Sequence, residues 1–196
     1  MALKQTPSQT VGPYFAYGLT PTQYGYDLPS IAGPELATEE TDGQPIRIVG
    51  QVFDGQGQPI GDAMIEIWQA DAQGRYAHPA DSRNPNATFR GFGRCGTGTD
   101  PRNRFVFETV KPGPTGDGSA PHTTVIVFMR GMLTHAYTRL YFSDEAEANA
   151  ADPVLASVPE DRRDTLIAKR EDTAAGVVYR FDIHMQGDRE TVFFEV

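Results

Sequence analysis

Alternating and continuous runs of hydrophobic residues dominate the chain from residue 46 onward. The run IRIVGQVF (46–53) is followed by the polar segment DGQGQPIGD (54–62) and then by AMIEIWQA (63–70). Short apolar runs rich in β-branched and aromatic residues are typical of strands, and clusters of Gly, Pro and Asp between them are typical of turns. The pattern therefore predicts a strand, a turn and a second strand.

The same pattern recurs at intervals to the end of the chain. Five more strands are expected, at RFVFETV (104–110), TTVIVFM (123–129), YTRLYF (137–142), VVYRFDIHM (177–185) and TVFFEV (191–196). Helical patterns are confined to SDEAEANAAD (143–152), with Ser143 as its expected cap, and SVPEDRRDTLIAKR (157–170). Many short strands with two peripheral helices predict an all-β fold, an antiparallel β-sandwich, over residues 46–196.

Two segments do not fit this pattern. Residues 1–45 have no sustained period and predict an irregular N-terminal arm, yet the arm carries Tyr14, Phe15, Tyr17, Tyr24 and Tyr26. That is too much aromatic surface for a solvated tail, so the arm is expected to pack either on a partner or around its own domain. Residues 71–102 form a long Gly-, Pro- and Asp-rich excursion, and loops of that length tend to carry function.

Composition narrows the choice of partners and compartment. With 196 residues, 39% of them hydrophobic, the chain suffices for one domain with a core. A formal net charge of −9 argues against binding to nucleic acid or an anionic membrane, and an anionic substrate would need local positive charge. The single cysteine, Cys95, excludes an internal disulfide, and the N-terminus lacks the apolar run of a signal peptide. We expect a cytoplasmic protein.

Histidine spacing alone does not identify a site. The four histidines, at positions 78, 122, 135 and 184, form no HxxxH or HExxH motif. No serine lies in a GxSxG turn, so a Ser/His/Asp hydrolase has no support.

The order of three short phrases is more informative. GRY ends in Tyr76, KPGPT ends in Thr115, and HTT runs from His122 to Thr124. This order resembles that of the intradiol ring-cleavage dioxygenases. In that family the Tyr of GRY, the Tyr of KPGPY and the two His of an HxH strand hold ferric iron. Phenolate oxygens and imidazoles suit that hard cation.

Half of the ligand set is missing here. Tyr76 and His122 match the family, but threonines stand at 115 and 124. A threonine hydroxyl is too weakly acidic to replace a phenolate and too poor a donor to replace an imidazole. We therefore expect these four positions to be a degenerate metal site that holds no iron in this chain.

In lacking these two ligands, the chain resembles the alpha subunit of the protocatechuate-cleaving members of the family, which binds no iron. TPSQTVGPYF (6–15), HAYTRLYFSDE (135–145) and YRFDIHMQGDRETVFFEV (179–196) also resemble that subunit. The resemblance implies a hetero-oligomer with a beta subunit of similar fold that carries the Fe(III). The complex would open protocatechuate with O2 to 3-carboxy-cis,cis-muconate, a step of aromatic catabolism in the beta-ketoadipate pathway.

The resemblance also implies which groups this chain contributes to its partner's site. They are Thr10, Gly12, Pro13 and Tyr14 of the arm, and Arg130 in FMRG. A Gly-Pro turn lets backbone approach a flat ring, and an arginine can bind a carboxylate. No catalytic residue is expected in this chain alone.

Two alternatives stay open at this stage. The chain could be an assembly module with no contact to substrate, its arm serving only association. It could also be a self-sufficient dioxygenase that completes the set of Tyr76 and His122 with other donors such as His78 or His135.

Overall fold

The computed structural model describes the whole chain except residues 1–3, 5, 13 and 84–87. Its strands are β1 (Pro45–Phe53), β2 (Met64–Gln69), β3 (Phe92–Gly96), β4 (Arg104–Val110), β5 (His122–Phe128), β6 (Ala136–Phe142), β7 (Ile167–Thr173), β8 (Gly176–Arg180) and β9 (Ile183–His184). Its helices are α1 (Phe15–Leu19), η1 (Pro21–Tyr24), α2 (Ala146–Ala151), α3 (Pro153–Ser157) and η2 (Glu160–Leu166).

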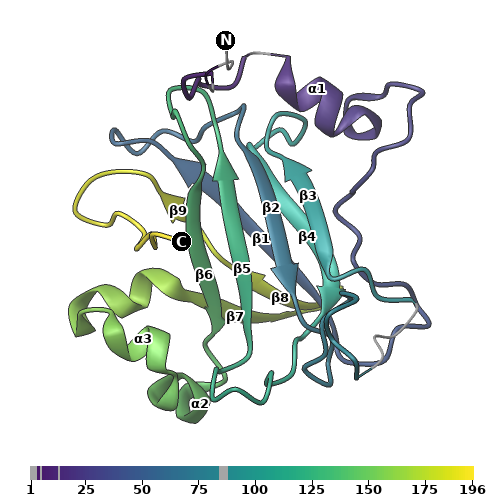
Figure 1. Cartoon of the computed structure of the whole chain (residues 1–196), viewed down its shortest axis with the longest axis vertical. Coiled ribbons are helices and arrows are strands. Elements are labelled where there is room, and N and C mark those ends of the chain that lie inside the picture. The colour runs from purple at the N-terminus through teal and green to yellow at the C-terminus, as the bar shows by residue number, and fades with distance from the viewer. Residues whose placement is uncertain (1–3, 5, 13, 84–87) are drawn as a thin grey trace.

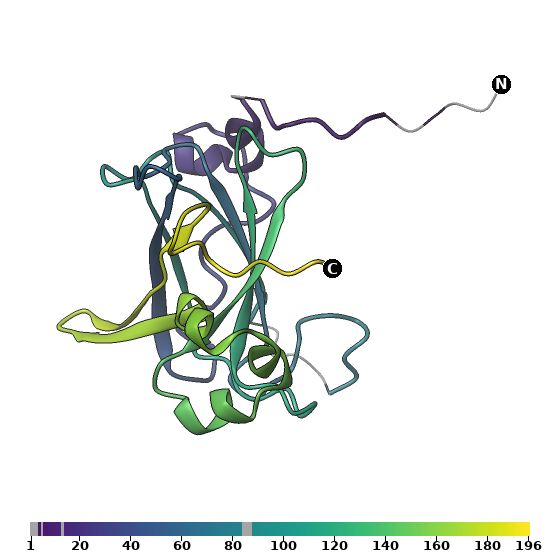
Figure 2. The same ribbon diagram turned by 90° about the vertical axis from the view of Figure 1, so that its left-hand side faces the viewer.

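The strands form a two-layered sandwich, as the sequence predicts (Figures 1 and 2). They follow the order β3-β2-β5-β6-β7-β8-β1-β4, with β9 paired to β1. In Figure 1, β3, β2, β5 and β6 form the front layer and β8, β1 and β4 lie behind them. Most pairs are antiparallel, but β6 with β7, and β1 with both β8 and β9, are parallel. The predicted all-β, antiparallel sandwich is therefore confirmed, with three parallel pairs that the sequence pattern does not indicate.

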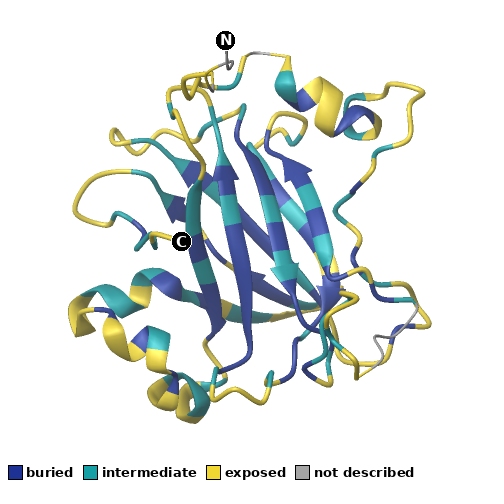
Figure 3. Cartoon of the chain, in the orientation of Figure 1, coloured by how far each residue is buried: buried dark blue, intermediate teal, exposed yellow. Residues whose placement is uncertain are grey.

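The core lies between the two layers, where many strand residues are dark blue in Figure 3. Ile65 and Ile67 of β2 face Phe105 and Phe107 of β4 within one buried cluster. Gly50 of β1 allows the backbone at Phe181 to approach β1 closely, because a Cβ on residue 50 would lie 1.8 Å from the carbonyl oxygen of Phe181. The period-2 pattern thus has the structural meaning that the sequence suggests.

Much of the N-terminal arm packs on its own domain. Hydrogen bonds run from Leu36 N to Glu108 O (2.8 Å) and from Arg94 N to Gly33 O (2.9 Å), so the arm closes the open edge between β4 and β3. Gln23 exchanges two hydrogen bonds with the backbone of Gly96, which holds η1 over the end of β3. The arm is thus only partly irregular, and packing on a partner stays a prediction for the residues before α1.

Three of the expected strands and helices differ from the structure. VVYRFDIHM (177–185) is split into β8 and β9, and TVFFEV (191–196) forms no strand although it was expected to. That segment is extended and makes single bonds, such as Phe194 N to Tyr137 O at 2.8 Å, in place of a ladder. The segment 157–170 is not one helix, because η2 ends at Leu166 and β7 begins at Ile167.

Two further differences concern local signals. Strand β3 lies inside the segment 71–102, whose Gly-rich sequence FGRCG hides it. Ser143 does not cap α2; the cap is Glu145, and the Ser143 hydroxyl accepts a bond from Arg170 N at 3.0 Å. None of the helices in the described part of the chain has the length and apolar character needed to cross a membrane.

Candidate functional site

The degenerate metal positions gather at the end of the sandwich where β2 ends and β5 begins. Trp68 and Thr124 are direct partners across β2 and β5. The Tyr76 ring stacks on Trp68, with centroids 5.8 Å apart and planes 7° apart. His122 lies two residues before Thr124 on the same face. Tyr76, His122 and Thr124 are thus close together, as the resemblance implies.

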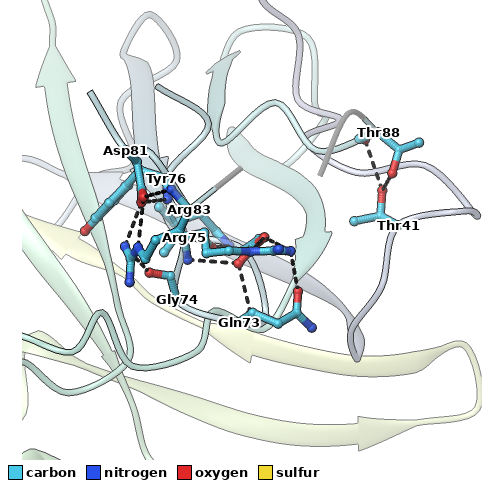
Figure 4. Close-up of polar contacts among 11 residues, drawn as sticks. Thr41, Gln73, Gly74, Arg75, Tyr76, Asp81, Arg83 and Thr88 are labelled. Carbon is cyan, nitrogen blue, oxygen red and sulfur yellow. Dashed lines mark hydrogen bonds and ion pairs between the residues drawn. The ribbon is translucent and has the colours of Figure 1, made fainter. Parts of the chain in front are cut away.

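A tight turn delivers Tyr76 to this place. Gly74 has φ +74°, and a Cβ on it would lie 1.8 Å from the carbonyl oxygen of Pro114, so the GRY turn lies directly against the KPGPT loop. The Tyr76 amide donates to Asp81 (2.8 Å), and Arg83 binds Asp81, the Gly74 carbonyl (2.9 Å) and the Thr115 carbonyl (3.3 Å). Figure 4 shows the bonds among Gly74, Tyr76, Asp81 and Arg83. The fourth degenerate position, Thr115, is thereby placed beside the other three.

The retained ligand positions are neutral groups with their own partners. His122 is buried, its Nδ1 lies 2.8 Å from the carbonyl oxygen of Ala120, and burial lowers its pKa. Burial likewise raises the pKa of the Tyr76 phenol, and the charge of Asp117 raises it further. At neutral pH both side chains are therefore uncharged.

The lost positions offer no substitute ligands. The Thr115 hydroxyl donates to Asp117 at 2.6 Å, and the Thr124 hydroxyl accepts from Tyr137 at 3.4 Å. Within the described ranges, no three His, Cys, Asp or Glu side chains come together as a metal cluster. A guanidinium nitrogen, Nη1 of Arg139, is buried at this end with no hydrogen-bond partner in the part of the chain that the structure describes. This donor set does not fit ferric iron.

The additional histidines do not complete the set. His78 lines an open cavity of about 680 Å³ together with Trp68, Tyr76, Ala80, Asp81, Ser82 and Arg83. Its Nδ1 accepts a bond from Ala80 N at 3.1 Å. His135 lies beside Phe128, at the far end of β5. A self-sufficient site built from Tyr76, His122 and these two histidines has no support from the geometry.

The second group of expected residues lies at that far end of β5. Arg130 follows the strand, its Nε donates to Asp62, and 56% of its side chain is exposed. The amide of the next residue, Gly131, donates to the Thr10 hydroxyl at 2.9 Å. The arm is therefore bound directly beside Arg130.

The arm residues that follow lead into α1. The carbonyl of Gly12 accepts from Phe15 N at 3.2 Å. Tyr14 precedes α1, contacts Tyr17 with ring centroids 6.0 Å apart, and is 79% exposed. Pro13 lies outside the described residues. A hydrogen bond joins Thr10 to Gly131 beside Arg130, and Gly12 and Tyr14 follow Thr10 along the chain. We call Thr10, Gly12, Tyr14 and Arg130 the "arm cluster".

The sequence analysis missed Asp62 and Arg139. Asp62 sits in a turn typical of solvated carboxylates, and its distance from Arg130 in the chain hides the pairing. Arg139 occupies a polar position of the alternating strand YTRLYF, a place that normally faces solvent. Its strand register could have been inferred only with the fold in hand.

Comparisons with known proteins agree with this geometry. The family model described as Dioxygenase matches residues 12–187. The "Protocatechuate 3,4-dioxygenase alpha chain" of Burkholderia cepacia is 59% identical over 195 residues, covering 99% of this chain and 98% of the relative. The "Protocatechuate 3,4-dioxygenase beta chain" of the same organism is 34% identical over 159 residues. The matched region is 74% of this chain and 66% of the relative.

A solved structure shows the same fold. The intradiol ring-cleavage dioxygenase of Tetranychus urticae superposes with a TM-score of 0.61 at 17% identity, covering 93% of this chain and 94% of that one. Both a family model over most of the chain and a relative that matches it nearly end to end identify the same family. The chain belongs to the intradiol ring-cleavage dioxygenase family.

Proposed function

We propose that this chain works as the alpha subunit of a protocatechuate 3,4-dioxygenase. The near full-length similarity to an alpha chain, and the weaker similarity to a beta chain from the same organism, support a hetero-oligomer of two related subunits. In this proposal the beta subunit holds the Fe(III) on which these dioxygenases depend. The alpha subunit completes the beta subunit's site, and the pair cleaves protocatechuate with O2 to 3-carboxy-cis,cis-muconate.

The separation of two groups along β5 carries this proposal. The degenerate site lies at His122, where β5 begins, and the arm cluster lies just beyond Phe128, where β5 ends. The strand alone spans about 20 Å, at about 3.3 Å per residue. The arm cluster therefore cannot serve the degenerate site of its own chain. Its groups fit a site in a second chain.

The arm is placed to reach such a chain. Figure 2 shows the N-terminal segment before Thr10 projecting away from the sandwich, on the side from which the C-terminal end also projects. The exposed ring of Tyr14 continues into the exposed side chains of Tyr17 and Leu19 on α1. An apolar, aromatic surface of this kind is typical of the centre of a protein interface.

Arg130 is suited to bind the carboxylate of protocatechuate. Asp62 engages its Nε, and no contact with a described residue occupies its two terminal nitrogens. Those nitrogens can form two parallel bonds to a carboxylate, the geometry that guanidinium groups favour. The net charge of −9 makes such a local cation necessary for an anionic substrate.

Each remaining group has a simpler task in the proposal. The backbone of Gly12 can approach the flat ring closely because no side chain intervenes, and Tyr14 can pack against the ring. Thr10 holds the arm to Gly131, beside Arg130. Pro13 is proposed to stiffen the turn. The iron of the beta subunit would supply the activation of the bound diol toward O2.

The exposed rings at Tyr14 and Tyr17 also favour a second candidate, an assembly module with no contact to substrate. In that case the arm would only hold the subunits together. For either role we expect a cytoplasmic complex, because Cys95 is free and buried and needs no oxidising compartment.

The test compares this chain alone, its beta subunit alone, and the two co-expressed. Iron per chain and cleavage of protocatechuate are measured on each preparation. We expect little iron and no cleavage for this chain alone, and a coloured, active complex. Near-stoichiometric iron with activity in this chain alone would refute the proposal. A beta subunit as active alone as in the complex would favour the assembly module.

A further inference from the structure

Arg139 lies on β6 beside the degenerate metal positions and has no role in the function proposed above. It is the direct partner of Thr124 across β5 and β6, and Thr124 is in turn the partner of Trp68 across β5 and β2. Side chains directly opposite one another in a sheet have Cβ atoms about 5 Å apart on the same face. Arg139 therefore shares one face with Thr124 and with Trp68, on which the Tyr76 ring stacks.

The Arg139 side chain is half-buried in this group and interacts with the Tyr141 hydroxyl on the same strand. Its Nη1 is buried and has no hydrogen-bond partner among the described residues, an arrangement that proteins rarely retain for a charged donor. Its charge thus lies on the face that carries His122, Thr124 and the stacked rings of Trp68 and Tyr76.

We propose that Arg139 is the fixed cation that takes the place of the metal charge and keeps ferric iron out of this chain. The loss of two ligands at positions 115 and 124 weakens binding, and the guanidinium adds an electrostatic barrier that is independent of that loss. A chain with this barrier leaves the iron to its partner. The proposal concerns the degenerate site alone and does not depend on what Arg130 binds.

Coulomb's law sets the size of the expected effect. A ferric ion held by two tyrosinates and two neutral imidazoles keeps a net charge of about one. Neighbouring side chains on one sheet face lie about 5–8 Å apart, and at a separation of about 6 Å and an effective dielectric constant of about 20 a unit charge would weaken iron binding about 100-fold. Restoring the two lost ligands should therefore not restore tight binding while Arg139 remains.

The experiment restores the ligands with and without the guanidinium. The starting variant carries Thr115→Tyr and Thr124→His in the full chain. It is compared with versions that add Arg139→Gln, Arg139→Met or Arg139→Lys. Each is loaded with Fe(III), and its iron affinity is measured by competition with a chelator and by the visible tyrosinate-to-iron absorption band. Circular dichroism establishes that each variant is folded, and the two neutral substitutions guard against one of them failing to fold.

The pattern across the series decides the question. We expect the Gln and Met versions to bind iron about 100-fold more tightly than the starting variant, and the Lys version to stay as weak as the starting variant because it keeps the charge. Equal affinity with and without Arg139 would overturn the proposal. So would a Lys version that binds as tightly as the Gln version, because side-chain shape would then be responsible. Folded neutral versions that bind no iron would overturn it too.

Discussion

Replacing Arg130 with alanine is the most direct way to examine the arm cluster. In the isolated chain the guanidinium is anchored by Asp62 through one nitrogen and is more than half exposed, so removing it leaves the core intact. In the assembled enzyme we propose that its terminal nitrogens bind the substrate's carboxylate. The substitution should then impair protocatechuate and spare catechol, which has no carboxylate.

The structure sets the magnitude. A hydrogen bond to a charged group contributes about 1.5–3 kcal/mol, and part of the charge of Arg130 is already balanced by Asp62. At about 1.4 kcal/mol per factor of ten, kcat/KM for protocatechuate should fall about 10- to 150-fold. For catechol it should change much less. The ratio of the two values cancels any general damage to folding or assembly.

The assay measures kcat/KM for both substrates on complexes of matched iron content. Arg180→Ala is the matched control, because Arg180 is also paired with a carboxylate, Glu171, and its side chain is 48% exposed. The control should leave the substrate ratio unchanged. An equal fall for protocatechuate and catechol in the Arg130→Ala complex would refute the reasoning. Arg130 would then support the subunit interface and would not bind the carboxylate.

Two further predictions follow from the degenerate site and from a partly exposed ion-pair network around Asp144. Replacing Tyr76 with Phe or His122 with Gln should leave the iron content and KM of the complex nearly unchanged, and metal analysis that finds iron lost from either variant would contradict this. Burial raises the pKa of Asp144, but bonds from Lys111, Tyr179 and Arg170 outweigh it and lower that pKa to about 2, from 3.8 for an unperturbed Asp. The carboxylate therefore contributes stability that is complete above about pH 4 and lost as the pH falls through about 2. In urea unfolding, the wild type should lose about 2 kcal/mol more than Asp144→Asn between these pH values, and parallel pH profiles would disprove the link.

Local pattern was sufficient for the strands that bury one face. The runs at 46–53, 63–70 and 104–110 became β1, β2 and β4 with bounds within about two residues, because alternation reports burial directly. TVFFEV (191–196) has the same local pattern but forms no strand, and it makes isolated bonds such as Phe194 N to Tyr137 O in place of a ladder. In FGRCG the two glycines weaken the signal, yet pairing with β2 makes it β3.

Most of the candidate site was also visible as residue types. The presence of Tyr76 and His122 and the threonines at 115 and 124 indicated a metal site that had lost half its ligands, and the structure brings those four positions together. The residues that surround them were not visible. Nothing local distinguishes Asp62 or Arg139 from ordinary surface charges.

The sequence by itself determined the sandwich and its main strands, and it placed threonines at the two positions where we predict lost metal ligands, because these features depend on side-chain chemistry and on the period of burial along one segment. Only the tertiary structure decided that the arm cluster and the degenerate site lie at opposite ends of β5, that β6 and β7 run parallel, and that Arg139 lies beside Thr124 on the face of the sheet opposite the core. Those outcomes depend on which strands pair and in which register. Pairing joins residues far apart in the chain, and it is settled by the packing of the whole core.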